Sequence, residues 1–251
     1  MSKTAILITS IARPKLLEKC VASWADILPT DKFAILIAEQ GAQTSAVTEV
    51  LKAWGGEYDH DTLSFDAGIS ASRNHLAKKA QKLGYRTGIV CADSIHGCPE
   101  FKADKALAAA KLITNELAII GFDIKGRIPW TYDMQLSDEG FILSKLDKRT
   151  FIKTSPRIKM CDICANFFIA RTEVLSEVGW DEELKLAEHE DFFMRLGDAK
   201  YLCAWTDEIA GQYVKETSAE YAKLRNRLYA EYKKKLLAKY KMTGWIKIKE
   251  A

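Results

Sequence analysis

Residues 4–28 read TAILITSIARPKLLEKCVASWADIL and contain the two kinds of element from which the fold is built. Thr4 to Thr9 is a short apolar run, long enough for a buried strand but too short for a helix. Ser10 to Pro14 breaks the run, and proline is favoured in the first turn of a helix, which predicts a helix from Pro14 to about Leu28. A buried strand followed by a helix is the repeating unit of α/β folds.

The same alternation continues along the chain. Further apolar strands are predicted at 33–38, 88–92, 117–122, 164–170 and 202–205, and further helices at 44–54, 69–83, 103–116, 171–178 and 218–240. Residues 126–146 alternate aromatic residues with turns, as a β-hairpin does. Apolar strands that alternate with helices predict an α/β fold with a mostly parallel sheet flanked by helices on both faces.

The composition fits one large α/β domain followed by a basic tail. The chain has 251 residues, of which 48% are hydrophobic and 28% charged. Its net charge of +3 is uneven, because residues 215–250 carry eleven Lys or Arg against four acids. We therefore expect a domain at 1–215 and a basic amphipathic helical extension at 216–251. With no recognisable signal peptide and no apolar run of about 18 residues, we expect a cytoplasmic protein.

Polar residues follow three of the predicted strands where each strand ends. Thr9-Ser10, Glu39-Gln40 and Asp93-Ser94 occupy these positions. Parallel sheets bind ligands beyond the carboxyl ends of their strands, so we expect a ligand site there. The GxGxxG and GxxxxGK[ST] patterns are absent from the sequence, which gives no support to a dinucleotide-binding or P-loop protein.

A second cluster of ionisable groups lies at residues 180–197, WDEELKLAEHEDFFMRLG. Glu188, His189, Glu190 and Asp191 stand together before a helix-like run. Acidic side chains are favoured in the first turn of a helix, and a carboxylate held there can act as a base. The alternative is an acidic N-terminal cap followed by a helix of the core.

Four segments in this order resemble a GT-A glycosyltransferase of the large inverting family 2. They are ILITSIARPKLLEKCVASW, FDAGISASRNHLAKKA, GIVCADSIH and NFFIARTEVLSEVGWDEELKLAEHEDFFMRL. The last is most similar to β-1,4-N-acetylgalactosaminyltransferases, which also carry Asn-Phe-Phe and His-Glu-Asp-Phe-Phe. The resemblance covers about residues 4–215. It implies an inverting transfer of a sugar from a nucleotide-sugar, a UDP-sugar, to a hydroxyl of a glycan or lipid-linked acceptor in bacterial surface polysaccharide synthesis.

The resemblance also implies roles for the strand-end residues. Thr9, Glu39 and Arg73 match positions that hold the nucleotide base, and Asp93 with Ser94 completes the nucleotide-sugar site. A carboxylate at Glu39 can accept the N3–H of uracil, and Arg73 can donate to a carbonyl or phosphate oxygen.

Asp93 also matches the first acid of the family's DxD motif, which holds Mn²⁺ or Mg²⁺ against the diphosphate. Here Ile95 replaces the second acid, and His96, one residue further on, could ligate a metal only if the loop bulges. Gln212 lies in the region where many relatives carry a late His ligand. These departures leave metal dependence open.

The register of the acidic motif is also open. Counting back from Arg195 pairs Glu188 and His189 with the family's Glu-Asp, whereas matching by residue type pairs Glu190 and Asp191. We predict Asp191 as the base, with Glu190 and His189 holding the acceptor. Three further residues are predicted to line the acceptor pocket: Asn166, Trp180 and Glu188. For Asn166 and Trp180, strand capping and core packing are the alternatives.

Some features of the sequence fit functions other than an enzyme. The altered DxD favours a non-catalytic module that binds a sugar nucleotide or a partner. Nucleic-acid binding has less support, because the tail's tyrosines fall largely on its apolar side. The tail's lysines beside a Leu/Tyr stripe, with an apolar tip at Trp245-Ile246, fit an interfacial helix on an anionic membrane. They fit equally a helix that packs on the domain with its lysines in solvent.

Overall fold

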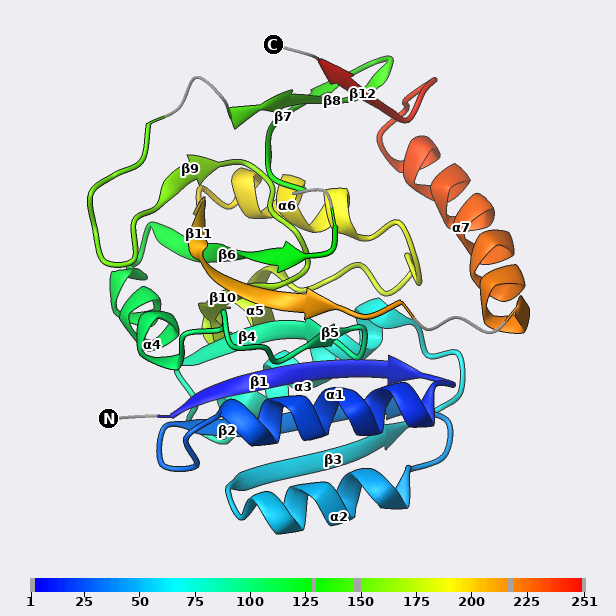
Figure 1. Ribbon diagram of the computed structural model, residues 1–251. Helices are drawn as coiled ribbons and strands as arrows, with labels where there is room; N and C mark the ends of the chain where they lie inside the picture. The colour runs from blue at the N-terminus through cyan, green and yellow to red at the C-terminus, as the bar shows by residue number, and fades with distance from the viewer. Residues whose placement is uncertain (1–2, 128–129, 147–149, 216–218, 250–251) are drawn as a thin grey trace.

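The computed structural model describes residues 3–127, 130–146, 150–215 and 219–249. Nine strands form the main sheet, with helices on both faces (Figure 1). The strands are β1 (Thr4–Ile11), β2 (Phe33–Gln40), β3 (Glu57–Leu63), β4 (Thr87–Ala92), β5 (Ile95–His96), β6 (Leu117–Lys125), β9 (Lys159–Cys161), β10 (Phe168–Arg171) and β11 (Leu202–Tyr213). Their order is β3-β2-β1-β4-β10-β6-β11-β5, and β9 pairs with β11. The strands from β3 to β4 are parallel, which confirms the predicted α/β class.

Helices cover the two faces of this sheet. They are α1 (Pro14–Ile27), α2 (Ser45–Trp54), α3 (Ile69–Lys82), α4 (Ala103–Leu112), α5 (Thr172–Val178) and α6 (His189–Asp198). The C-terminal helix α7 (Ala219–Lys239) lies to the side of the sheet, beyond the strand ends (Figure 1). Alternate residues of β1 enter different cores: Ile6 and Ile8 pack with α1, α2 and α4, while Ala5 and Leu7 pack with α3, α5 and α6. A strand buried on both faces is apolar at every position, which is why TAILIT is continuous.

The strand register brings the polar strand ends to one edge. Ser10 of β1 lies opposite Glu39 of β2, and Thr9 lies opposite Ala92 of β4. Asp93 follows directly, and its N–H donates to the carbonyl of Thr9 at 3.1 Å. The polar ends of β1, β2 and β4 therefore lie side by side at one edge of the sheet, where the ligand site is predicted.

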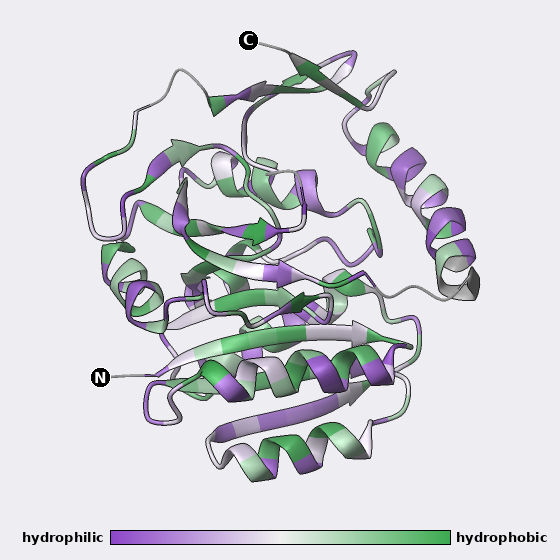
Figure 2. Ribbon diagram, in the orientation of Figure 1, coloured by the Kyte–Doolittle hydropathy of each residue, from purple (hydrophilic) through white to green (hydrophobic). Residues whose placement is uncertain are grey.

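The strand β3 was not predicted. Its sequence EYDHDTL is hydrophilic (Figure 2), because β3 is the last strand of the sheet and lies half-exposed. Lys79 of α3 pairs with Asp59 at 2.7 Å and with Asp61 at 2.6 Å. These ion pairs take the place of the apolar packing that identifies an inner strand.

A second sheet has the order β12-β8-β7. The hairpin of β7 (Tyr132–Ser137) and β8 (Gly140–Lys145) confirms the one predicted within 126–146. The parallel strand β12 (Ile246–Lys249) was not predicted. Gly140 has φ 126°, and a Cβ there would overlap the carbonyl oxygen of Trp245. Only glycine allows the two segments to approach so closely.

The C-terminal helix α7 packs on the domain through its apolar stripe. Tyr232 and Leu236 are buried in the same core as α3, α5 and α6, with Leu228 and Tyr240 partly buried beside them. The side chain of Leu224, which also belongs to the predicted stripe, lies outside the described residues. Trp245 packs edge-on against Phe141, with ring centroids 6.1 Å apart. These contacts favour the packing alternative over the interfacial helix.

Candidate functional site

A cavity lies beyond the carboxyl ends of β1 and β4 and is enclosed by four parts of the chain. The strand ends contribute Thr9, Ser10 and Ala92, and α3 begins at its rim with Gly68 and Ile69. The segment before α6 contributes Lys185 and Leu186. Arg225 and Leu228 of α7 close it from the other side.

A second cavity adjoins the first at Gln40, which lines both. Glu39, Thr44 and Phe65 line it, with the start of α1. The Phe65 side chain is 61% exposed, which is unusual for a large apolar ring. Together the two cavities form an elongated site along the strand ends, with an exposed aromatic ring at one end.

Glu39 is fixed at the wall of this second cavity. Its carboxylate accepts from the Thr44 N–H at 2.9 Å, the Thr44 hydroxyl at 2.5 Å and His60 Nε2 at 2.9 Å. Burial alone would raise the pKa of Glu39, but the bonds from His60 and Thr44 outweigh it and lower the pKa. Glu39 is therefore an ionised acceptor at neutral pH, with its geometry set before any ligand arrives.

Asp93 is completely buried, and both of its oxygens are engaged. The Ser10 hydroxyl donates to Oδ2 at 2.6 Å, and the Arg13 guanidinium donates to Oδ1. Burial raises the pKa of Asp93 to about 6, against the opposing effect of Arg13. The carboxylate is held by a cation that the protein itself supplies.

The residues around Asp93 do not fit a divalent cation. At a diphosphate, Mn²⁺ or Mg²⁺ needs at least one or two carboxylates with an oxygen free to ligate it. Both oxygens of Asp93 already accept hydrogen bonds, from Ser10 and Arg13. Ile95, in place of the second acid, packs in the core, and His96 belongs to β5, where it pairs with Gln212. Within the ranges that the structure describes, no group of three or more His, Cys, Asp or Glu side chains could hold a metal.

Arg73 lies on the acidic motif and lines neither cavity. Its guanidinium donates to Glu188 Oε1 at 2.6 Å and lies 5.4 Å from the ring centroid of Trp180. This differs from the predicted contact of Arg73 with the nucleotide base. The neighbouring Asn74 donates to the Trp180 carbonyl at 2.8 Å and accepts the Trp180 N–H at 2.7 Å. The segment around Arg73 therefore ties α3 to the acidic motif.

Trp180 itself is buried and stacks on Phe192, with ring centroids 4.3 Å apart. Its place is in the core, which was the alternative to a role in the acceptor pocket.

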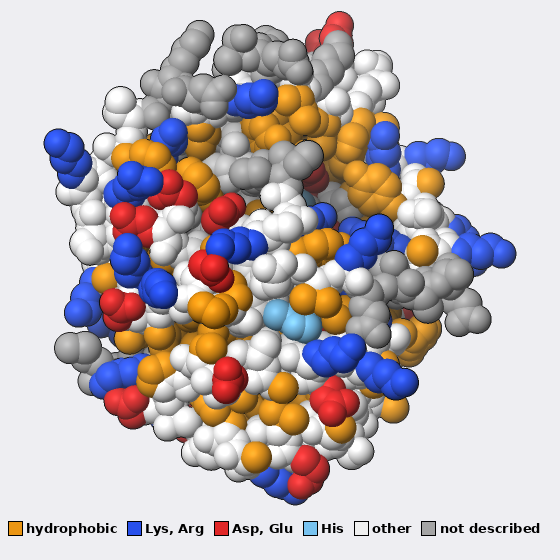
Figure 3. All heavy atoms as spheres, viewed as in Figure 1, with side chains coloured by type: hydrophobic (Ala, Val, Ile, Leu, Met, Phe, Trp, Pro, Cys, Tyr) orange, Lys and Arg blue, Asp and Glu red, His pale blue; other side chains and the backbone are white. Residues whose placement is uncertain are grey.

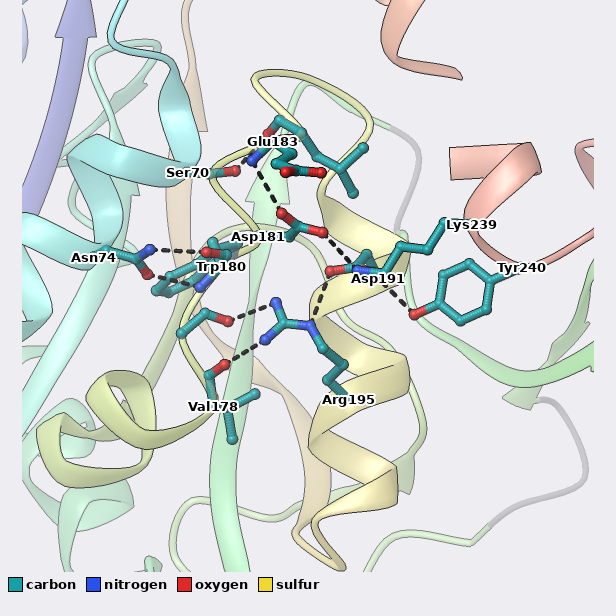
Figure 4. A network of polar contacts seen from close by, with 12 residues as sticks. Ser70, Asn74, Val178, Trp180, Asp181, Glu183, Asp191, Arg195, Lys239 and Tyr240 are labelled. Carbon is teal, nitrogen blue, oxygen red and sulfur yellow. Dashed lines mark hydrogen bonds and ion pairs between the residues drawn. The ribbon is translucent and has the colours of Figure 1, made fainter. Parts of the chain in front are cut away.

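Asp191 is also engaged on both oxygens (Figure 4). Arg195 Nε donates to Oδ2 at 2.9 Å. Lys239 and Tyr240, at the end of α7, donate to Oδ1 at 2.5 Å and 2.9 Å. The carboxylate is completely buried and joins α6 to the C-terminal helix. A base needs a free lone pair facing the acceptor, so this geometry does not favour Asp191 in that role.

Glu190 and His189 differ from Asp191 in having few polar partners. Burial raises the pKa of Glu190 to about 7, and the charge of Glu188 adds to the effect. Burial and the charge of Arg73 lower the pKa of His189 to about 3, so the imidazole is neutral. Its Nδ1–H donates to Asn166 Oδ1 at 2.8 Å, while its buried Nε2 has no hydrogen-bond partner among the described residues. Asn166 is thereby joined to the acidic motif.

Sequence reasoning missed Arg13, Phe65, Lys185 and Arg225. Arg13 carried a signal, because it directly precedes the proline that starts α1 and so lies beside the end of β1. The other three reach the cavities only through tertiary packing.

Neither the family models nor the curated proteins include a match to this chain. Solved structures do resemble it. S. aureus TarS 1-349 in complex with UDP-GlcNAc has a TM-score of 0.60 at 16% identity, covering 88% of this chain and 60% of TarS 1-349. Its complex with UDP has a TM-score of 0.57 at 18% identity, covering 92% and 65%. The mannosyltransferase PcManGT from Pyrobaculum calidifontis, in complex with GDP-Man and Mn²⁺, has a TM-score of 0.61 at 10% identity, covering 94% and 64%.

This chain thus spans less than two thirds of each of these proteins. The likeness confirms the GT-A fold expected from the sequence. Separately, none of the helices in the described ranges has the length and apolarity needed to cross a membrane.

Proposed function

We propose that this chain is a glycosyltransferase that moves a sugar from a UDP-sugar to a hydroxyl of a glycan or lipid-linked acceptor, with inversion at the anomeric carbon. The observation that carries the proposal is the elongated site along the strand ends. The second cavity offers a fixed carboxylate and an exposed ring, and the first is lined by Arg13, Lys185 and Arg225. Lys185 and Leu186, which line the first cavity, precede the acidic motif by a few residues in the chain. A GT-A fold with this arrangement matches what a nucleotide-sugar requires.

The base end suits uracil. Glu39 retains an acceptor lone pair on Oε1, which can take the N3–H of the ring. Phe65 offers a face on which the pyrimidine can stack, a contact worth about 1–3 kcal/mol per base. Thr9 and Ser94, at the ends of β1 and β4, remain our candidates for contacts further along the donor.

Glu190 replaces Asp191 as our candidate base. Its pKa of about 7 is near neutral pH, where a general base works best. In the proposed step, Glu190 takes the proton of the acceptor hydroxyl, whose oxygen attacks the anomeric carbon. The bond from that carbon to the diphosphate breaks, and its electron pair leaves with the diphosphate. We assign to His189 and Asn166, which are hydrogen-bonded to each other, the role of orienting the acceptor. The Arg73–Glu188 pair holds the motif in position.

The donor sugar is the finer part of the proposal. The motif's similarity to β-1,4-N-acetylgalactosaminyltransferases and the likeness to TarS, solved with UDP-GlcNAc, favour a UDP-N-acetylhexosamine. A role in bacterial surface polysaccharide synthesis follows as the setting for such a transfer.

A thermal-shift screen of UDP- and GDP-sugars tests the donor class, because a specific ligand raises Tm by mass action. We expect UDP-N-acetylhexosamines to give the largest shift and Glu39→Gln to reduce it. Binding without any UDP release, with or without added glycan acceptors, would indicate the non-catalytic alternative. A shift with GDP-sugars alone would contradict the assignment of the base pocket.

A further inference from the structure

Three cationic side chains from three separate elements line the cavity at the strand ends: Arg13, Lys185 and Arg225. They come from the turn before α1, the segment before α6, and α7. Figure 3 shows Lys and Arg side chains on both sides of this face of the molecule, including the side where the strands end and α7 lies. Because these three are far apart in sequence, the folded chain has gathered positive charge at one place.

Building on the proposed function, we propose that these cations, and chiefly Arg13 and Arg225, neutralise the donor diphosphate in place of a divalent metal, so that donor binding is metal-independent. In the usual arrangement a divalent ion supplies the positive charge that meets the diphosphate. Here the side chains of the protein supply positive charge without a metal. The Arg13–Asp93 and Lys185–Asp66 pairs are neutral, and Arg225 adds one positive charge.

Arg13 occupies the face of Asp93 that a metal would need. Its guanidinium donates to Oδ1, while Ser10 donates to Oδ2 at 2.6 Å. The Asp93 side chain is fully buried, whereas 17% of the Arg13 side chain is exposed. A guanidinium has five N–H donors in a planar fork that matches phosphate oxygens. Because Arg13 lines the cavity as well as donating to Asp93, its positive charge lies next to a phosphate bound there.

Arg225 reaches the same cavity from a helix whose far end is fixed. Lys239 pairs with Asp181 at 2.6 Å and with Asp191 at 2.5 Å, and Leu236 is completely buried. Arg225 and Leu228 are three residues apart, so they share the face of α7 that closes the cavity. Among the residues that the structure describes, no carboxylate pairs with Arg225. Its charge is available to a ligand.

Lys185 lines the cavity and holds the neighbouring residue Asp66 in place. Its Nζ donates to the Asp66 carbonyl at 2.5 Å and to Asp66 Oδ2 at 2.9 Å. Gly68 has φ 96°, and a Cβ there would lie 2.7 Å from Cγ of Lys185. The lysine stem therefore packs on a backbone that only glycine tolerates, next to the start of α3.

In the transfer, negative charge grows on the diphosphate oxygen as its bond to the anomeric carbon breaks. Guanidinium donors already directed at that position stabilise the charge without reorganisation. This is the task that a metal ion performs in many GT-A enzymes, and arginine performs it here.

Isothermal titration of the full chain with UDP and with uridine, in EDTA and in excess Mn²⁺, tests the inference. We expect the Kd for UDP to agree within about twofold between EDTA and Mn²⁺. Arg225→Ala should weaken UDP binding by about tenfold, as expected for the loss of a charge-assisted contact, and change uridine binding little. Arg227→Ala, on the same helix but away from the cavity, is the matched control and should bind UDP normally.

Arg13→Lys supplements this test, because it keeps a cation beside Asp93 while losing the planar fork. It should weaken UDP binding without changing the far-ultraviolet circular dichroism. Binding of UDP that requires Mn²⁺, or unchanged binding by Arg225→Ala and Arg13→Lys, would overturn the inference and leave the proposed function standing. Failure of UDP to bind in either condition would overturn both.

Discussion

At Glu190, burial has two effects, because it raises the pKa of the carboxyl group to about 7 and keeps competing partners away. The base must be ionised, so activity should increase as the pH rises through 7. We predict that kcat/KM for transfer falls about tenfold per pH unit below 7. Glu190→Gln should abolish turnover at every pH while UDP binding persists. Glu183→Gln, an exposed neighbour, is the control, and a flat profile in the wild type would contradict the role of Glu190.

The same shift has a consequence for stability. The ordinary pKa of Glu190 is 4.5 and its folded value is about 7, so the folded protein favours the protonated form. Stability linked to this group is present at low pH and is lost as the pH rises from about 4.5 to 7. Glu190→Gln should therefore raise Tm at pH 8 and leave it nearly unchanged at pH 5. Equal effects at both pH values would mean that the carboxyl group titrates normally.

Asp191, unlike Glu190, has a structural role, because both of its oxygens accept hydrogen bonds. Asp191→Asn removes or weakens the three hydrogen bonds that Asp191 accepts. Each hydrogen bond to a charged group contributes about 1.5–3 kcal/mol. We predict a loss of at least about 2 kcal/mol in the free energy of unfolding, measured by urea denaturation. Asp198→Asn, exposed on the same helix, should change it little. Unaltered stability together with abolished turnover would restore Asp191 as the base.

At the scale of elements, the buried strands and the helices between them could be predicted because their apolar runs are local. The end of α4 could not. The helix was predicted to reach residue 116 but stops at Leu112, and the Thr114 hydroxyl then accepts the N–H groups of Glu116 and Leu117. The strand β11 runs to Tyr213 rather than 205, through an irregularity after Trp205. β3 was not predicted because an edge strand can be polar and so lacks an apolar run. β12 was not predicted because its pairing partner, β8, lies far away in the sequence.

In the candidate site, too, the sequence predicts the features that are local and misses those that depend on contacts between distant residues. The strand-end positions Glu39 and Asp93 were found because the continuous apolar run of each strand stops at its end. The partners of Asp191 were not, since Lys239 and Tyr240 lie 48 and 49 residues away in sequence. Likewise the Arg73–Glu188 pair joins residues 115 apart. Roles that depend on such contacts follow from packing, which no local pattern reveals.

At the scale of the whole molecule, α7 and β12 are held by the domain rather than standing apart from it. Ending the chain after Tyr221 removes the buried side chains of Tyr232, Leu236 and Met242. It also removes Lys239 and Tyr240, which donate hydrogen bonds to Asp191. We predict that the truncated protein loses cooperative thermal unfolding, and that the intact protein does not pellet with anionic vesicles at about 0.15 M salt. A truncated protein of unchanged Tm, together with salt-sensitive pelleting of the intact one, would instead establish α7 as an interfacial helix.

The central claim is that the strand-end site and the acidic motif act together as a transferase, and UDP release reports on both. UDP formation from a UDP-N-acetylhexosamine should be measured in EDTA for the wild type, Glu190→Gln and Glu183→Gln, without acceptor and with a panel of glycans. The account predicts slow hydrolysis by the wild type and Glu183→Gln, its acceleration by an acceptor, and its loss in Glu190→Gln. Equal UDP release by wild type and Glu190→Gln, or none from any UDP-sugar that binds, would contradict it.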